Sequence, residues 1–184
     1  MTLTVEAGPI GGIPQGGAKF GGSVNPDCIL DQPYQFDFYD GAGVDLAFLG
    51  LAQADSHGNI NVSKFGPRIA GYCGTFTAGG LKTEVKDGKL VVNQEGKSVK
   101  FLKDVEQITF SGEYANKIKQ PVMYITERAV FELKEDGMHL VEVAPGIDVK
   151  TQVLDLMDFE PIIDGEPKLM DMRIFRDEVM GLKK

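Results

Sequence analysis

The stretch VDLAFLGLAQ, residues 44–53, decides the fold class that the sequence predicts. It is a nearly continuous apolar run from Val44 to Ala52. A run of this length suits a strand that is covered on both faces, as in the interior of an α/β sheet. We therefore expect a buried strand here and an α/β fold around it.

The residues that follow this run form a turn with polar side chains. ADSHGN (54–59) contains Gly58, where φ can be positive, and INVSKF (60–65) resumes an extended pattern. Open α/β sheets place their ligands at loops after the carboxyl ends of buried strands. Asn59 and Asn61 are therefore candidates for polar contacts with a ligand. Stabilisation of the turn is an equally good interpretation of both.

Upstream of the run, a carboxylate precedes a glycine-rich segment. TLTVE (2–6) is strand-like and opens into AGPIGGIPQGGAKFGGS (7–23), and seven of the 23 glycines of the chain fall between Gly8 and Gly22. Glu6, at the end of a strand beside a backbone with few side chains, can approach a large substrate closely. The glycine N–H groups are expected to be free to face that substrate. The alternative is a flexible glycine-rich leader.

Downstream of residue 75 the pattern becomes that of a scaffold with hairpins. Asp87-Gly88 is a strong hairpin signal, and Asp136-Gly137 predicts a second tight turn. The expected strands are LKTEV (81–85), KLVVN (89–93), VEQITFS (105–111), VMYITE (122–127), AVFEL (129–133) and MHLVEVA (138–144).

One helix is predicted near the end of the chain. Asp148 is placed to cap it, and Val149, Val153, Leu154 and Met157 return to one face. The tail from residue 161 to 184 has no clear period. We expect it to lie over the domain surface or against a partner.

Composition excludes several classes of function. The chain has 184 residues, enough for one domain, and we predict a single domain over 1–184. Its formal net charge of -8, with no basic stripe, argues against binding nucleic acid. No apolar run is long enough to span a bilayer, and the N-terminus does not resemble a signal peptide. We expect no membrane association and a cytoplasmic protein.

The cysteines and histidines predict no metal centre. Cys28 and Cys73 are expected to be reduced and mostly buried thiols rather than a disulfide or a metal pair. His57 and His139 lie far apart in the sequence, with no partners at the spacing of metal ligands.

The glutamate among glycines permits three roles. Glu6 can be a nucleophile, a general base or a helix-capping carboxylate without a catalytic role. A nucleophile requires donors for a developing oxyanion and a site that excludes water. The sequence has no Ser-His or Cys-His pair near Glu6, no GxxxxGK[ST] after a strand and no GxGxxG in this segment. A hydrolase triad, a P-loop and a dinucleotide site are therefore not expected.

The chain resembles the second half of the family I coenzyme A transferases, in the group that acts on acetate, propionate and 3-oxoacids. The resemblance rests on the string from TVEAGPIGG through VNPDCILDQPYQFDFYDGAGVDLAFLGLAQADSHGNINVSKFGPRIAG. It continues through YCGTFTAGGLK, VEQITFSGEYA, YITERAVFEL, APGIDVKTQVLDLMDF and LMDMRIFR, and so covers essentially the whole chain.

The resemblance implies a fold and a domain. It implies an α/β domain with an open, largely parallel sheet, flanking helices and an antiparallel hairpin region. The chain then corresponds to the C-terminal, beta-type half, and the N-terminal, alpha-type half is absent. Another polypeptide is expected to supply that half, unless this is an isolated portion; a homo-oligomer is also compatible with the resemblance.

The resemblance also implies a mechanism. Glu6, in VEAGPIGG, matches the active-site glutamate of the family. It would attack an acyl-CoA, form a glutamyl-CoA thioester, and pass CoA to a short-chain carboxylic acid such as acetate. CoA is a substrate, and no cofactor is needed. Ping-pong kinetics should follow.

Similarity places further residues along the CoA path. These are the backbone near Ala52, the TAGG turn around Gly79, and Lys82, for which an ordinary surface lysine is the alternative.

One departure from the family pattern concerns the oxyanion donor. The family carries a GCGGF-type segment after GPRIAG, whereas here Gly71 runs directly into Tyr72-Cys73-Gly74. Gly74 is therefore not assigned that role. The alternatives to a transferase are a non-catalytic or degenerate fragment that binds CoA or a partner chain, and an acyl-CoA hydrolase.

Overall fold

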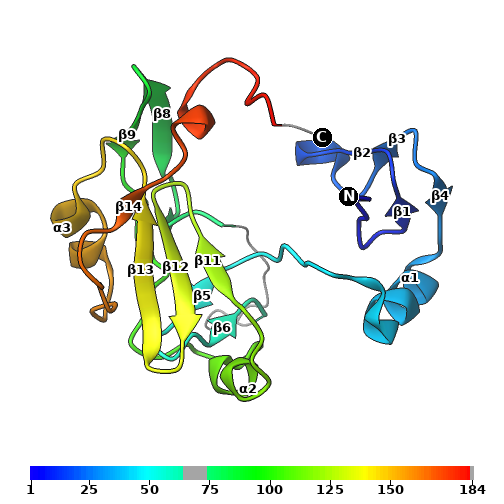
Figure 1. The fold of residues 1–184 in the computed structure, drawn as a ribbon, viewed down its shortest axis with the longest axis horizontal. Coiled ribbons are helices and arrows are strands. Elements are labelled where there is room, and N and C mark those ends of the chain that lie inside the picture. The colour runs from blue at the N-terminus through cyan, green and yellow to red at the C-terminus, as the bar shows by residue number, and fades with distance from the viewer. Residues whose placement is uncertain (64–73, 183–184) are drawn as a thin grey trace. The chain divides into compact units, whose positions relative to one another are not determined.

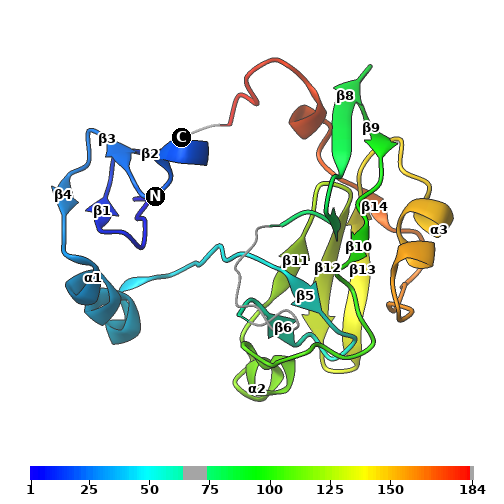
Figure 2. The same cartoon turned by 180° about the vertical axis from the view of Figure 1, so that it is seen from behind.

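The computed structural model describes residues 1–63 and 74–182. It divides into two compact units, residues 1–48 and 49–184, which we call unit 1 and unit 2 and describe separately. Figures 1 and 2 show the elements of both. The single domain remains a prediction.

Unit 1 is built from two short antiparallel strand pairs and a helix. β1 (Pro9–Ile10) pairs with β4 (Cys28–Ile29), and β2 (Ile13–Pro14) pairs with β3 (Ser23–Val24), so the second pair lies inside the first along the chain. The 3-10 turn η1 (Gly17–Lys19) lies at its tip, and α1 (Gln32–Phe38) with η2 (Tyr39–Gly43) follows. The glycine-rich stretch is thus a folded double hairpin, and the alternative of a flexible leader is wrong.

Glycine is required where the two arms of this hairpin approach each other. Gly8 has φ +129, and a Cβ there would lie 2.1 Å from the carbonyl oxygen of Leu30. Gly12 has φ +72, and its Cβ would lie 2.3 Å from the carbonyl oxygen of Val24. Both positions combine a left-handed conformation with backbone contact, so no side chain fits.

The buried strand predicted from Val44 to Ala52 is wrong over most of its length. Leu46, Phe48 and Leu49 are 62, 76 and 83% exposed, and β5 (Gln53–Ala54) begins only after the run. A strand requires a hydrogen-bonding neighbour. Within the described residues no strand pairs with residues 44–52.

Unit 2 contains a four-stranded sheet in the order β11-β12-β13-β14 (Figure 1). These strands are β11 (Met123–Ile125), β12 (Ala129–Lys134), β13 (Gly137–Val143) and β14 (Lys168–Leu169). The first three are antiparallel, because tight turns join them, and β13 with β14 is parallel. The α/β class is confirmed, and the sheet is mixed, with more antiparallel pairs than the sequence predicted.

Shorter pairs surround this sheet. β8 (Lys82–Lys86) and β9 (Lys89–Gln94) form the predicted hairpin, with φ of 52 and 72° at Asp87 and Gly88, as a type I′ turn requires. Two other antiparallel pairs are β5 with β6 (Ile60–Asn61), and β7 (Thr77–Ala78) with β10 (Ser98–Val99).

Two helices of unit 2 begin at side-chain caps. Ser111 accepts a hydrogen bond from the N–H of Tyr114 and begins α2 (Gly112–Lys117), which the sequence did not predict. Asp148 accepts from the N–H of Thr151 and begins α3 (Val149–Gln152), which confirms the predicted cap. This helix is shorter than expected, because Val153 leaves helical geometry before η3 (Leu154–Leu156).

The strand predicted over 105–111 is wrong. Phe110 makes only an isolated bridge to Ile60, and Ser111 is already the cap of α2. The predicted tail is confirmed to lie on the surface of its own unit, because Met170, directly after β14, and Phe175, at the end of η4 (Met172–Phe175), are buried against Leu90 and Val130. No helix among the described residues has the length and apolar character to cross a bilayer.

Three phenylalanines form the centre of the core of unit 2. Phe76, Phe101 and Phe131 are fully buried, with ring centroids 4.7 Å (76–101), 5.1 Å (101–131) and 6.4 Å (76–131) apart. Offset and tilted ring pairs at these distances are favourable beyond the area that they bury. The core ties β7, β12 and the segment around residue 101 together.

Candidate active site

Glu6 lies on a tight turn of unit 1. The N–H of Gly8 donates to the carbonyl of Val5 at 2.9 Å, and the N–H of Val5 donates to the carbonyl of Pro9 at 3.0 Å. Thr4 makes an isolated bridge to Ile10, so a single residue of the strand-like segment predicted over 2–6 pairs with another. The Glu6 side chain is exposed. Its carboxylate is therefore open to solvent.

The glycine N–H groups are less available than the sequence suggested. The N–H of Gly8 bonds to Val5, that of Gly11 to the carbonyl of Leu3 at 2.7 Å, and that of Gly22 to the carbonyl of Lys19 at 3.1 Å. At these three positions the expectation of free donors is wrong. Their glycines shape the turn instead of presenting donors to a substrate.

A buried amide lies next to the Glu6 turn. Gln35, on α1, has no exposed surface, and its Nε2 donates to Thr4 Oγ1, to the hydroxyl of Tyr39 at 2.8 Å and to the carbonyl of Val5 at 3.5 Å. The hydroxyls of Thr4 and Tyr39 are 2.7 Å apart. Sequence reasoning missed Gln35, since the helix that carries it was not predicted.

The predicted asparagines both make structural contacts. Asn59 Oδ1 accepts from the N–H of Gly112 at 3.1 Å, and its Nδ2 donates to Asp55 at 3.1 Å. Asn61 is fully buried, donates to Gln53 Oε1 at 2.7 Å and accepts from the N–H of Ser63. These bonds favour the turn-stabilising interpretation that the sequence left open.

Residues predicted along the CoA path lie in unit 2. Ala52 is buried, and the ammonium of Lys100 donates to the neighbouring carbonyl of Leu51 at 3.2 Å. Gly79 has φ +79 and joins β7 to β8, where Lys82 is exposed. Glu6 belongs to unit 1, so the predicted residues divide between the two units.

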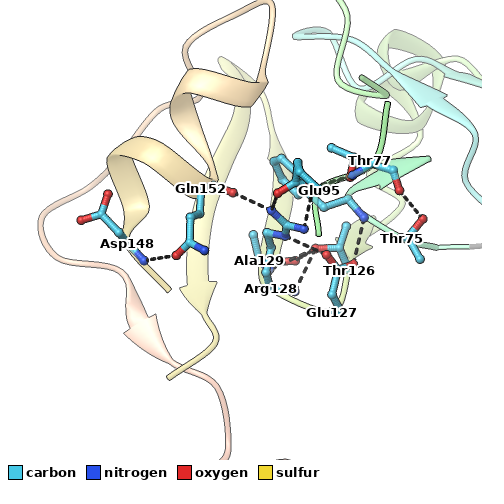
Figure 3. A network of polar contacts seen from close by, with 11 residues as sticks. Thr75, Thr77, Glu95, Thr126, Glu127, Arg128, Ala129, Asp148 and Gln152 are labelled. Carbon is cyan, nitrogen blue, oxygen red and sulfur yellow. Dashed lines mark hydrogen bonds and ion pairs between the residues drawn. The ribbon is translucent and has the colours of Figure 1, made fainter. Parts of the chain in front are cut away.

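An ionic network surrounds the buried Arg128, and it includes Thr77, two residues before Gly79 in the chain (Figure 3). Arg128 is fully buried; its guanidinium makes two bonds to Glu95, at 2.8 and 3.0 Å, and one to Glu127 at 2.7 Å. It also donates to the carbonyl of Gln152 at 3.1 Å and lies 5.1 Å from the centre of the Phe76 ring.

The two carboxylates also accept hydrogen bonds from Phe76 and Thr77, at the start of β7. The hydroxyl of Thr77 donates to Glu95 Oε1 at 2.5 Å, and the N–H of Phe76 donates to Glu127 Oε2 at 2.8 Å. Burial by itself raises the pKa of Glu95, but the hydrogen bonds from Arg128 and Thr77 outweigh it, so this pKa lies below its usual value. The network thus holds the residues that lead into Gly79.

A second cluster surrounds His139 on the sheet. The buried imidazole lies 2.9 Å from Asp164 (Nδ1) and 2.7 Å from Asp136 (Nε2), and Lys134 donates to Asp164 at 3.2 Å. The hydrogen bond with Lys134, and then that with His139, lowers the pKa of Asp164. A cavity of about 410 Å³ adjoins this cluster. Within the described part of the chain no group of three or more His, Cys, Asp or Glu residues could hold a metal ion.

Two further predictions concern the cysteines and the shortened segment. Cys28 is exposed, so the expectation of a buried thiol is wrong for it; it lies on β4, in a sheet of two short strands. Cys73 lies outside the described residues, as does the junction from Gly71 to Tyr72.

The known proteins to which this chain is similar are coenzyme A transferases. No protein-family model matches the chain. The acetate CoA-transferase YdiF of Escherichia coli (strain K12) is 52% identical over 97% of this chain. The caffeate CoA-transferase of Acetobacterium woodii is 44% identical over 99%. The chain spans 36 and 38% of the length of these two relatives.

Solved structures agree. The apoenzyme of the acyl-CoA transferase YdiF from Escherichia coli O157:H7 superimposes with a TM-score of 0.88 at 50% identity, over 99% of this chain and 37% of that one. A thioester complex of the same enzyme with CoA gives 0.89. The glutaconate coenzyme A-transferase of Acidaminococcus fermentans shares the fold at 16% identity and a TM-score of 0.58, over 91% of this chain and 72% of that one.

Proposed function

This chain is homologous to a part of the coenzyme A transferases, and on this premise we propose that it carries the nucleophilic glutamate of an acyl-CoA:carboxylate CoA-transferase. The observation that carries the proposal is the 52% identity to an acetate CoA-transferase along 97% of the chain. Glu6, on an exposed turn, is the proposed nucleophile. The proposed substrates are a short-chain acyl-CoA and a carboxylic acid such as acetate.

The proposed overall reaction exchanges one thioester and one carboxylate for another thioester and another carboxylate. The carboxylate of Glu6 attacks the acyl-CoA carbonyl, and the C–S bond breaks, which gives a mixed anhydride of Glu6 with the acyl group and releases CoA as a thiolate. The thiolate then attacks the glutamyl carbonyl, so the first carboxylate leaves and a glutamyl-CoA thioester remains. The acceptor carboxylate reverses both steps and departs as the new acyl-CoA, which restores Glu6. No water is consumed, and the proposal includes no cofactor beyond CoA as a substrate.

The reaction needs a site that excludes water, because water would hydrolyse the thioester. In unit 1 taken by itself, Glu6 is exposed. We therefore include a companion in the proposal: an alpha-type half, or another copy in an oligomer, covers Glu6. The extent of the relatives supports this, since about two thirds of their length has no counterpart in this chain.

CoA binding by unit 2 is part of the same proposal. The Gly79 turn follows residues held by the Arg128 network, and Lys82 is exposed where a phosphate could be reached. Ala52 would contribute its backbone, since its side chain is buried. We place the enzyme in the cytoplasm, in short-chain acyl-CoA and ketone body metabolism.

Replacement of the nucleophile tests the proposal. In the enzyme assembled with its alpha-type half, Glu6→Gln should abolish CoA transfer, and Glu6→Asp should be severely impaired because the shorter side chain misplaces the carboxylate. Incubation with acyl-CoA followed by borohydride or hydroxylamine should modify Glu6, as detected by mass spectrometry. The matched control is Glu113→Gln, an exposed glutamate on α2, which should transfer normally. Near-normal turnover of Glu6→Gln would refute the assignment.

The exposure of Glu6 favours one second candidate, an acyl-CoA hydrolase, because water reaches the same carboxylate. Measurement of acetate-dependent CoA transfer against release of free thiol separates the two activities. A non-catalytic fragment predicts that Glu6 stays unmodified by acyl-CoA even when the alpha-type half is present.

A further inference from the structure

The buried amide of Gln35 bonds to the two residues that immediately precede Glu6. Its Nε2 has two hydrogens, which are shared among Thr4 Oγ1, the hydroxyl of Tyr39 and, at 3.5 Å, the main-chain carbonyl of Val5. That same carbonyl accepts the N–H of Gly8, the bond that closes the Glu6 turn. One side chain on α1 thus fixes both the entry of the turn and one of its closing groups.

Tyr39, at the start of η2 and four residues after Gln35, bonds to both Gln35 and Thr4. Its hydroxyl lies 2.8 Å from Gln35 Nε2 and 2.7 Å from Thr4 Oγ1. Gln35, Tyr39 and Thr4 therefore form a closed triangle of hydrogen bonds, which we call the Gln35 clamp. Each member restrains the other two, so the Thr4–Val5 backbone has little freedom to shift relative to α1.

The clamp is not the arrangement that stability alone would favour. Gln35 Oε1 is buried and has no hydrogen-bond partner among the described residues. An unpaired buried carbonyl oxygen is destabilising, and an apolar side chain of similar size would avoid that cost. Unsatisfied polar groups in native structures call for a reason other than stability, and a strained or costly group beside a reactive residue is one such reason.

We propose that Gln35 is a positioning residue for Glu6: its amide holds Thr4 and Val5 so that the carboxylate is presented in the geometry of attack. The inference rests on the proposed role of Glu6. It requires no contact between Gln35 and substrate. Displacement of a nucleophile by about 1 Å can lower the reaction rate on the order of 100-fold. Loss of the Gln35 clamp, which holds the two residues before Glu6, should therefore lower turnover strongly.

Two substitutions remove the clamp without changing the size of the side chain greatly. Gln35→Met replaces the amide, and Thr4→Val replaces the hydroxyl by a methyl group. Each should lower kcat of the assembled enzyme by about 10- to 100-fold and leave KM for acyl-CoA within about 3-fold, since substrate contacts are unchanged. Hydroxylamine trapping at Glu6 should slow in parallel. Amide hydrogen exchange of residues 4–8 should become faster in the chain by itself.

Matched variants separate positioning from folding. Thr4→Ser keeps the hydroxyl and should restore turnover. Tyr34→Phe removes an exposed hydroxyl from the same helix and should behave as the unmodified chain, whereas Tyr39→Phe should resemble Gln35→Met in a milder form. If Gln35→Met does not assemble, the Thr4→Val and Thr4→Ser pair decides the question.

Two outcomes would overturn the inference: normal kcat in folded Gln35→Met and Thr4→Val, or equal losses in Thr4→Val and Thr4→Ser. These are distinct from failure of the proposed function, which is normal transfer by Glu6→Gln. If Glu6→Gln is inactive and Gln35→Met is normal, only the positioning role is lost.

Discussion

Unit 1 and unit 2 are stabilised by different means. In unit 2 the phenylalanine core and a second cluster around Leu90 and Phe175 bury apolar side chains. In unit 1, among the residues whose exposure is described, Val5 and Pro9 are the only buried apolar side chains. Its order comes from glycines that let backbones touch and from the Gln35 clamp. The candidate nucleophile therefore lies in the unit that has the smaller core.

The difference has a physical consequence. Burial of an aliphatic or aromatic side chain contributes roughly 1.5–3 kcal/mol to the free energy of unfolding. Domains of fewer than about 40 residues usually need disulfides, metals or oligomerisation as well, and unit 1, residues 1–48, is near that size. Unit 1 leaves many large apolar side chains exposed, among them Ile13, Phe20, Ile29, Tyr34 and Phe38. We expect unit 1 to gain order when a companion covers these side chains, and unit 2 to hold its fold by itself.

The largest expected effect comes from the same substitution in both units. Phe131→Ala, in the core of unit 2, should lower the free energy of unfolding by about 3–5 kcal/mol, because it leaves a cavity beside the rings of Phe76 and Phe101. Phe20→Ala, at a side chain that is 70% exposed in unit 1, should change it by less than about 0.5 kcal/mol. Urea denaturation measures both. Equal losses would remove the proposed distinction.

The ionic network gives the next effect. Arg128→Met leaves Glu95 and Glu127 without their cation, and removal of one partner from a buried pair costs about 3–5 kcal/mol; partial exposure of both carboxylates puts the expectation at the lower end. Thermal unfolding followed by circular dichroism measures the loss. Arg173→Met, at an exposed pair with Asp171, is the control and should leave the midpoint nearly unchanged. A small effect at Arg128 would mean that the pair is dispensable.

A substitution in unit 1 tests its backbone packing. Gly12→Ala requires an alanine at φ +72 with its Cβ against the carbonyl of Val24, and should cost roughly 1–2 kcal/mol from the left-handed conformation alone. Faster amide exchange over residues 8–30 is the expected sign. Gly16→Ala is the control, since its Cβ meets nothing within 4 Å and its φ is negative. Similar exchange in both variants would show that close approach does not stabilise the hairpin.

The smallest effect is a pH dependence confined to unit 2. The pKa of Glu95 is lower in the folded than in the unfolded state. Its contribution to stability is therefore fully present above the usual carboxyl pKa of 4.5 and is lost as the pH falls through the depressed value. Unfolding free energies between pH 7 and 3 should decline less steeply in Glu95→Gln than in the unmodified chain. If the unfolding free energy declines equally with pH in both chains, Glu95 is not the source of the pH dependence.

Local signals predicted several elements well. Asp87-Gly88 specifies a type I′ turn through two positive φ values, and Asp148 caps a helix through a bond to Thr151 three residues away. The segment 2–22 was predicted to present a carboxylate to a substrate; Glu6 is exposed on a turn there, and its catalytic role stays a prediction. In contrast, the apolar run 44–52 predicted a covered strand, and the structure exposes Phe48 and Leu49.

The amino-acid sequence by itself determined the turns, the caps, the glutamate–glycine motif and the likeness to CoA-transferases, because each depends on residues close together in the chain or on their order. Only the tertiary structure decided that Arg128 is buried between Glu95 and Glu127, and that Gln35 lies behind the Glu6 turn. Burial depends on what distant segments cover: Arg128 and Glu95 are 33 residues apart in the chain, and Gln35 and Val5 are 30 apart. Such proximity follows from packing and leaves no periodic pattern in the sequence.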